Sequence, residues 1–173
     1  MSAIKQQMVA AGFRTVEDAQ ATLGIGTDGI VGPITRNEWK EFVEGGYKVT
    51  PHFHLDEFRC KCGCGRVRVI RRLPVRLEVL RRLRKKNGKL YFPKGIRVVS
   101  GYRCPTHNRK VGGASGSQHL LGRAVDIPNV IDYRDVRRAG VFTGIGVSKN
   151  GNAVHVDVRG GANVYDPAVW WYK

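Results

Sequence analysis

A histidine and an aspartate, His119 and Asp126, lie seven residues apart in the sequence, with a glycine between them at Gly122. Residues 124–127 follow this glycine and predict a short strand that carries the aspartate. A histidine on a loop and an aspartate on a strand can converge on one cation, and His155 supplies a third ligand further along the chain. Three protein ligands plus one water molecule are the usual arrangement of a catalytic zinc site.

The residues around these ligands form a longer and more specific pattern. It consists of Ser-Gly-Tyr-Arg at 100–103, Ser-x-His-x(6)-Asp at 117–126 and His-x-Asp at 155–157. In these motifs the sequence resembles the M15 zinc peptidases, the family of D-alanyl-D-alanine carboxypeptidases and peptidoglycan endopeptidases. The resemblance covers roughly residues 53–172.

The resemblance assigns a function to five residues. It implies that His119, Asp126 and His155 bind zinc, which lowers the pKa of a water molecule to about 7 so that it can attack an amide carbonyl. Arg103 matches the family arginine that holds the substrate or stabilises the developing negative charge. Ser117 matches a family serine that hydrogen-bonds the substrate peptide.

The general base is less clear from the sequence. Many family members carry an acidic residue three positions before the third ligand, but here that position is Asn152, which cannot accept the proton. Asp157 lies two residues after His155, on the same face of a strand, and resembles a His-x-Asp variant of the family. We expect Asp157 to be either the base or a carboxylate that orients the site. His107 is family-like in position and is expected to bind substrate or order its loop rather than to bind metal.

The charge of the chain is strongly positive and unevenly distributed. There are 30 Lys and Arg residues against 14 Asp and Glu, a net charge of +16. The first 50 residues carry 5 basic and 6 acidic side chains, so the rest of the chain carries 25 and 8, a net +17. This change, together with the nearby Pro51, predicts a small module at 1–48 and a second domain at 49–173.

The first module is predicted to contain short helices. One helix covers 16–23 after an N-cap at Thr15, and another covers 36–44 after a cap at Thr35. This module resembles the peptidoglycan-binding domain repeat, on the strength of Leu23, Gly24, the segment 28–33, Thr35 and Phe42. The resemblance implies binding to the cell wall; the alternative is a helical module that serves only packing.

Residues 66–86 contain ten basic side chains. Leucines at 73, 77, 80 and 83 recur at helical spacing, so we expect a helix with a basic outer face that ends at Asn87 and Gly88. Such a face attracts polyanions, for which we expect anionic cell-envelope polymers or an outer-membrane surface. No nucleic-acid partner is expected, because aromatic residues and nucleic-acid motifs do not accompany the basic residues.

The four cysteines leave three interpretations open: Cys60, Cys62, Cys64 and Cys104. They can bind a second, structural zinc, form a disulfide after release from the cell, or remain free thiols. The first residues lack the pattern of a signal peptide, so we expect the protein to stay in a host cytoplasm until it is released to the cell wall. We also expect a monomer.

In the second domain we predict a strand at 96–100, a helix at 131–139 and paired strands at 144–147 and 153–158 around an Asn-Gly turn. The M15 resemblance implies an α+β fold of the zinc DD-peptidase-like (Hedgehog-like) type, a small antiparallel sheet with flanking helices. The small all-α module precedes it.

The expected function is zinc-dependent hydrolysis of peptide bonds in peptidoglycan stems or cross-links, in a phage or prophage endolysin that lyses the wall. Candidate bonds are D-Ala-D-Ala, the cross-link and L-Ala-D-Glu. One alternative is a non-catalytic wall-binding or phage structural protein that retains a zinc site. Another is a nucleic-acid-binding protein, which is supported only by the charge.

Overall fold

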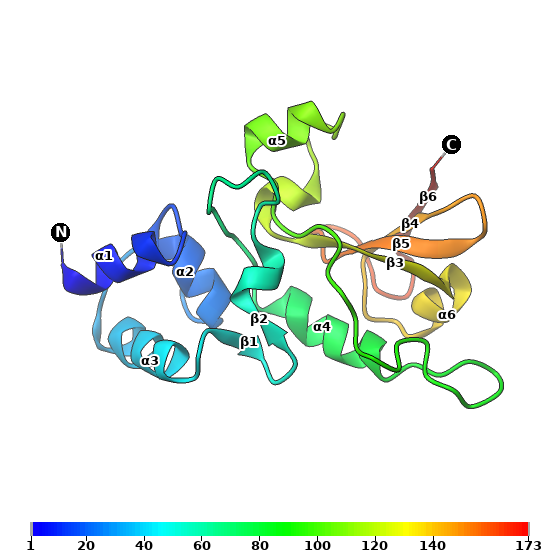
Figure 1. Ribbon diagram of the computed structural model, residues 1–173, viewed down its shortest axis with the longest axis horizontal. Coiled ribbons are helices and arrows are strands. Elements are labelled where there is room, and N and C mark those ends of the chain that lie inside the picture. Colours follow the sequence, from blue (N-terminus) through cyan, green and yellow to red (C-terminus); the bar gives the residue numbers. More distant parts are fainter. Residues whose placement is uncertain (1, 173) are drawn as a thin grey trace.

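Three helices pack together at one end of the molecule and a four-stranded sheet lies at the other, with α4 and a connecting segment between them (Figure 1). The computed structural model describes residues 2–172. The helices are α1 Ala3–Ala10, α2 Val16–Leu23, α3 Pro33–Glu44, α4 Arg72–Arg81, α5 Pro105–Lys110 and α6 Tyr133–Arg138. The strands are β1 Lys48–Thr50, β2 Phe53–His54, β3 Ala124–Asp132, β4 Gly144–Val147, β5 Asn152–Asp157 and β6 Ala168–Trp171, and two short 3₁₀ helices are η1 Leu55–Phe58 and η2 Gln118–Leu121. Across residues 2–172, none of the helices has the length and apolar character needed to cross a membrane.

The α-helical end follows the sequence prediction with one correction. Helix α2 begins after Thr15, whose hydroxyl accepts a hydrogen bond from the Asp18 N–H at 3.1 Å, as an N-cap does. Helix α3 begins at Pro33, before the predicted cap at Thr35, because proline suits the first helical turn, where no N–H partner is needed. Thr35 is instead a buried residue within the helix and donates to the Ile30 carbonyl at 3.1 Å.

The helical end shares its packing with the rest of the chain. The segment 66–71 returns to the first two helices, where the Val67 N–H donates to the Gly12 carbonyl at 3.0 Å. The Thr22 hydroxyl donates to the Val69 carbonyl at 2.7 Å. One hydrophobic cluster runs without a break from the helices into the sheet. The predicted boundary between residues 48 and 49 falls within β1, and the contacts of segment 66–71 tie the parts on either side of it together.

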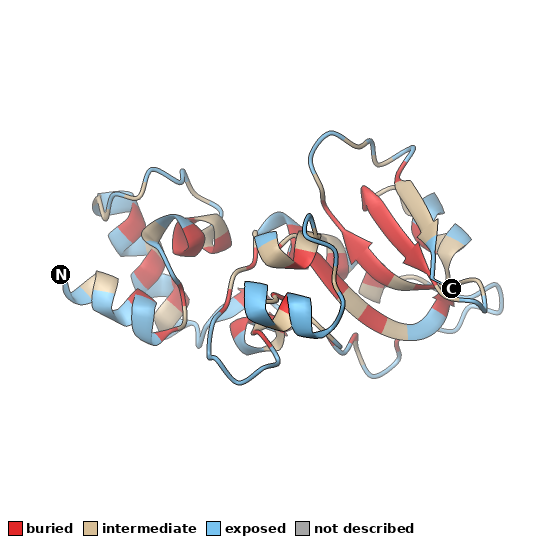
Figure 2. Ribbon diagram, turned by 90° about the horizontal axis from the view of Figure 1, so that it is seen from above, coloured by how far each residue is buried: buried red, intermediate tan, exposed pale blue. Residues whose placement is uncertain are grey.

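The sheet has the strand order β3-β5-β4-β6. Strands β3, β5 and β4 are antiparallel neighbours, and β6 pairs with β4 in parallel. The hairpin of β4 and β5 matches the strands predicted at 144–147 and 153–158. Figure 2 shows that buried residues concentrate in these central strands, whereas helix α5 and the outer loops are largely exposed.

Two predicted elements differ in the structure. Residues 96–100 are extended but form only an isolated bridge, between Ser100 and Asp126, because the chain then leaves the sheet edge to pack on η1. The predicted basic helix is shorter than expected and covers only Arg72–Arg81. Residues before it are extended, since buried Val67 and Val69 alternate with more exposed residues, as in a strand.

The residues after α4 form a hairpin-like turn rather than more helix. Arg84 bridges to Leu90, and the Lys85 N–H donates to the Lys89 carbonyl at 2.8 Å. Two arginines of the predicted outer face also make internal contacts: Arg72 donates to the Val158 carbonyl at 2.9 Å, and Arg81 pairs with Glu78. The freely exposed positive charge is therefore concentrated in the turn at 82–89 instead of along a helical face.

Candidate metal centre

Three predicted ligands converge at the edge of the sheet. His119 lies on η2, Asp126 on β3 and His155 on β5, and the last two are direct cross-strand partners. The His119 Nε2 atom lies 3.1 Å from His155 Nδ1 and 3.2 Å from Asp126 Oδ1, and His155 Nδ1 lies 3.0 Å from the same carboxylate oxygen. Both histidines are buried. The spacing in the sequence thus becomes a compact triangle of one oxygen and two nitrogen atoms.

Local structure explains why seven residues separate the first two ligands. Ser117 precedes η2, and its hydroxyl accepts a hydrogen bond from the His119 N–H at 3.4 Å. Gly122 ends η2 with a φ of 64°, in the left-handed region that glycine tolerates. A Cβ at this position would lie 2.4 Å from the carbonyl oxygen of Arg68. Only glycine fits this turn, which delivers the chain directly into β3 and Asp126.

The outer nitrogen of each histidine has its own partner. His119 Nδ1 lies 2.6 Å from the Gly101 carbonyl oxygen, which requires a proton on that nitrogen and leaves Nε2 free to bind a cation. His155 Nε2 lies 3.2 Å from a carboxylate oxygen of Asp157, which leaves Nδ1 facing the centre. A hydrogen-bond partner at the outer ring nitrogen fixes the tautomer and the orientation of a metal-binding histidine.

The donor set and its dimensions fit zinc. Tetrahedral zinc with bonds of about 2.0 to 2.1 Å to nitrogen and oxygen requires ligand atoms about 3.3 Å apart. The three separations here, 3.0 to 3.2 Å, are close to that value. Burial alone would raise the pKa of Asp126, but its close contacts with His119 and His155 outweigh burial and hold the pKa well below its usual range. The carboxylate is therefore in the anionic form that a metal needs.

Asp157 lies behind the centre. It is fully buried, and Arg159 encloses its carboxylate with a backbone N–H at 3.1 Å and its Nε at 2.9 Å. Burial would raise the pKa of Asp157, but the contacts with His155 and Arg159 lower it to about 2. Of the two functions predicted for Asp157, these contacts fit orientation of His155 better than transfer of a proton from water.

A cavity of about 880 Å³ opens in front of the three ligands, and both Arg103 and Ser117 line it. Arg103 forms an ion pair with the outer oxygen of Asp126, and its Nε donates to the Ser100 hydroxyl at 3.0 Å. The structure thus brings five predicted site residues to one cavity. His107 lies elsewhere, with its Nδ1 3.2 Å from the sulfur of Cys60.

The cavity also contains residues that the sequence analysis did not identify: Gln118, Arg159, Trp170 and Tyr172. The Trp170 ring stacks edge-on against His155 at 5.1 Å, and Arg159 lies over the same ring at 4.8 Å. The aromatic residues at 170–172 were the only sequence signal for this wall of the cavity. The sequence did not predict that the first two of them belong to a strand, β6, that pairs with β4. Among the residues that the structure describes, Asp126 is the only carboxylate that lines this cavity.

Comparison with known proteins agrees with the geometry. The peptidase M15 family matches residues 51–157, a range that contains all three converging ligands. A zinc D-Ala-D-Ala carboxypeptidase from Streptomyces albus G is 29% identical over 127 residues, which cover 72% of this chain and 49% of that protein. The chain therefore spans about half the length of this relative, and the first helices lie outside the family match. Because the family matches well over half of the sequence and includes the metal centre, this chain belongs to the peptidase M15 family.

Proposed function

We propose that the protein is a zinc-dependent peptidase that hydrolyses peptide bonds in the stem peptides or cross-links of peptidoglycan. The observation that carries the proposal is the convergence of His119 Nε2, Asp126 Oδ1 and His155 Nδ1 at the wall of an open cavity. Membership of the peptidase M15 family supports the reaction class. The relative that is a zinc D-Ala-D-Ala carboxypeptidase supports the substrate class.

Zinc held by these three residues would polarise the scissile carbonyl and make a water molecule reactive near neutral pH. Arg103 supplies a fixed positive charge at the cavity wall, where it can stabilise the negative charge that develops on the carbonyl oxygen. Its ion pair with Asp126 holds the guanidinium beside the metal centre before substrate arrives. Ser117 and Gln118 offer hydrogen bonds to the peptide, and Trp170 forms an apolar wall.

Asp157 contributes as a positioning residue. It accepts from His155 Nε2 and thereby fixes Nδ1 toward the centre, while Arg159 keeps the carboxylate anionic and in place. This arrangement supports the orienting function and makes Asp157 a poor proton acceptor for substrate water, since its side chain is fully enclosed.

The test is cleavage of purified muropeptides by the full chain, followed by mass spectrometry of the products. The panel contains a D-Ala-D-Ala-terminated stem, a cross-linked dimer and a stem with an intact L-Ala-D-Glu bond but no terminal D-Ala-D-Ala, so the product mass identifies the bond. We expect cleavage that stops with a chelator, returns with zinc, and is absent in His155→Ala. A zinc-loaded protein that cleaves none of these substrates would overturn the proposal and favour a non-catalytic wall-binding or phage structural protein.

We further infer a bacteriolytic function of the endolysin type, in which the protein is made in a host cytoplasm and acts on the wall after release. The net charge of +16 supports it, because a cationic enzyme is attracted to anionic envelope polymers. Purified protein added to permeabilised bacteria should lower the turbidity of the suspension. Release of stem peptides without loss of turbidity would instead indicate a trimming enzyme.

The α-helical end is proposed to bind the wall. Gln20 holds the loop after α2 by donating a hydrogen bond to Asp28 at 2.7 Å, so Asp28 maintains the loop rather than faces a ligand. That loop and the start of α3 present two exposed apolar side chains, Ile30 and Ile34. The double variant Ile30→Ser, Ile34→Ser should sediment less with purified sacculi while it cleaves soluble muropeptides at the normal rate. Unchanged sedimentation would exclude this surface.

A further inference from the structure

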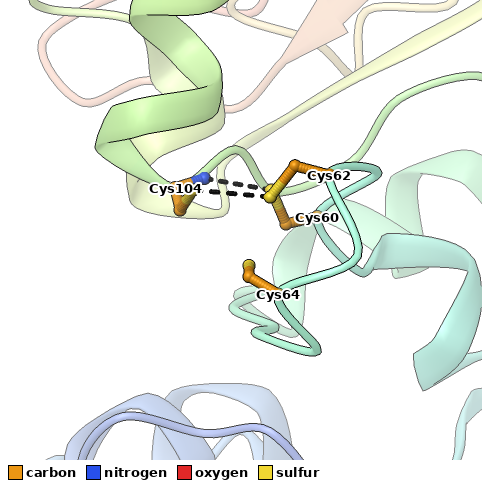
Figure 3. A group of neighbouring side chains, drawn as sticks. All are labelled: Cys60, Cys62, Cys64 and Cys104. Atoms are coloured by element: carbon orange, nitrogen blue, oxygen red, sulfur yellow. Dashed lines mark hydrogen bonds between the residues drawn. The ribbon is translucent and has the colours of Figure 1, made fainter.

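Four cysteines from two distant parts of the chain meet beside α5. Cys60, Cys62 and Cys64 belong to the loop that follows η1, and Cys104 is the N-cap residue of α5. Their sulfur atoms all lie within 4.8 Å of one another. Figure 3 shows the loop bringing its three cysteine side chains to the side of Cys104.

The distances fit four thiolates around one metal ion. Zinc–sulfur bonds of about 2.3 Å in a tetrahedron place the sulfur atoms about 3.8 Å apart. The Cys62 sulfur lies 3.7 Å from that of Cys104 and 3.3 Å from that of Cys60. Since Cys62 has two sulfur neighbours at similar distances, the arrangement favours no single disulfide pair.

The loop backbone explains how cysteines separated by single residues can reach one metal ion. Cys-x-Cys-x-Cys is tighter than the Cys-x(2)-Cys of common zinc sites. Gly63 adopts a φ of 80°, in the left-handed region, so the chain turns sharply between Cys62 and Cys64. The turn brings both sulfur atoms to the same centre.

Backbone N–H groups donate to two of the four sulfur atoms, as they can to metal-bound thiolates. The Cys104 N–H donates to the Cys60 sulfur at 3.3 Å, and the His107 N–H donates to the Cys104 sulfur at 3.4 Å. Lys61 and Arg66 lie close to these cysteines in the sequence and carry positive charge. Four thiolates with one zinc carry a net charge of −2, which these cations partly offset.

We propose that Cys60, Cys62, Cys64 and Cys104 bind a structural zinc ion that fixes the loop 60–65 to the start of α5. The ion would add a second link between these two segments. The first link is a backbone hydrogen bond, in which the Tyr102 N–H donates to the Phe58 carbonyl at 2.9 Å.

Arg103 lies between these two links, after Tyr102 and before Cys104, and its side chain extends to Asp126 and forms an ion pair with it. The structural zinc therefore also positions Arg103 at the candidate active centre, a consequence that rests on the proposed peptidase function. The metal site itself does not depend on that function.

His107 offers a test of the ligand set, because its Nδ1 lies 3.2 Å from the Cys60 sulfur. It lies outside the group of four mutually close ligand atoms and is placed to hydrogen-bond the thiolate instead. Cys64→Ser should therefore lower the zinc content, and the matched variant His107→Ala should retain it. The reverse result would replace Cys64 by His107 in the site and overturn the proposed ligand set.

The decisive measurement is zinc per chain in the full-length protein, purified without reductant and dialysed. We expect two zinc ions in the wild type, one in His155→Ala and one in Cys62→Ser, Cys64→Ser. Cobalt substitution identifies which site remains, because cobalt bound by thiolates has an intense charge-transfer band. The band should persist in His155→Ala and disappear in the cysteine variant.

A measurement on the wild type alone guards against a cysteine variant that fails to fold. Thiol-reactive labelling under native conditions should be slow until a chelator is added, and the intact mass should show four reduced cysteines. One zinc per chain without the cobalt band, or a mass that reveals a disulfide, would overturn the site.

Positioning of Arg103 is tested separately by kinetics. The cysteine double variant should lower kcat on muropeptides tenfold or more, and combining it with Arg103→Gln should add little to the loss from Arg103→Gln alone. Fully additive losses would refute the proposal that the structural zinc positions Arg103, but they would not affect the proposed zinc site itself. A wild type that holds two zinc ions but cleaves nothing would instead refute the proposed peptidase function.

Discussion

Arg103 and Asp157 each form an ion pair beside the metal centre, but on opposite sides of it. Arg103 pairs with the outer oxygen of Asp126 and lines the cavity that substrate must enter. Asp157 pairs with Arg159 behind His155 and has no exposed surface. Arg103 thus faces the cavity, whereas Asp157 faces only His155 and Arg159, and we propose that it acts through the histidine.

Replacement of Arg103 by glutamine should lower kcat by about 10² to 10³, because one preorganised donor to the developing oxyanion is lost. The zinc content should stay normal, since Arg103 is not a ligand. Steady-state kinetics on a soluble muropeptide together with metal analysis checks this, and Arg103→Lys should recover part of the rate. A change in KM alone would assign Arg103 to substrate binding.

Asp157→Asn distinguishes the two functions that the sequence left open for this residue. If Asp157 orients His155, zinc affinity should fall about 10- to 100-fold, and excess zinc should restore most of the activity. A general base would behave differently, because kcat would stay low at saturating zinc while the affinity was unchanged. Zinc titration with a competing chelator, followed by activity at saturation, decides between them.

The sequence was sufficient to predict which ligands meet, because the motif spacing encodes a 3₁₀ turn, a glycine and a strand start. It was not sufficient to predict the surroundings of Asp157. Its enclosure depends on Arg159 folding back onto it and on the strand beside it, which no local pattern encodes.

At the scale of elements, Glu78 joins α4 to the turn between β1 and β2. Its carboxylate accepts from the Thr50 hydroxyl at 2.8 Å and from the His52 N–H at 3.1 Å, and it lies 2.9 Å from His52 Nδ1. Arg81 adds a further positive contact from the same helix. Burial would raise the pKa of Glu78, but these hydrogen bonds outweigh it and lower the pKa.

Glu78→Gln should lower the free energy of unfolding by about 1 to 2 kcal/mol at pH 7, since a charged acceptor with several donors is lost. A lowered folded-state pKa stabilises the fold above the unfolded pKa of about 4.3, and this contribution is lost as the pH falls further. The stability difference between the two proteins should therefore shrink between pH 5 and 3 in urea unfolding experiments. A difference that is independent of pH would contradict the assigned contacts.

Local signals predicted some elements and missed others for physical reasons. The cap at Thr15 and the Asn-Gly hairpin depend on neighbouring residues, and α2, β4 and β5 were predicted close to where they lie. The extent of α4 and the existence of β6 depend on distant partners: residues 66–71 bind the first helices, and β6 pairs with β4. Periodicity within one segment cannot report such contacts.

At the scale of the whole molecule, the exposed basic turn lies far from the α-helical end (Figure 1). Neutralising its free side chains in Arg82→Gln, Lys86→Gln, Lys89→Gln should weaken attack on intact walls that carry anionic polymers. Cleavage of a soluble muropeptide should not change. Turbidity and peptide-release assays over a range of salt concentrations check this, and the wild type should lose its advantage as salt rises. Equal loss on both substrates would refute an electrostatic function for the turn.

The backbone contacts between segment 66–71 and the first two helices limit how the molecule can work on a surface. Because the α-helical end is hydrogen-bonded to the rest of the molecule, it cannot move independently as a flexibly linked domain would. The distance between this end and the cavity is therefore fixed. If that end holds the wall, each docked molecule reaches only the few peptides at that distance. Further cleavage then requires that the protein dissociate from the wall and bind again, so a very high affinity for the wall would slow its digestion.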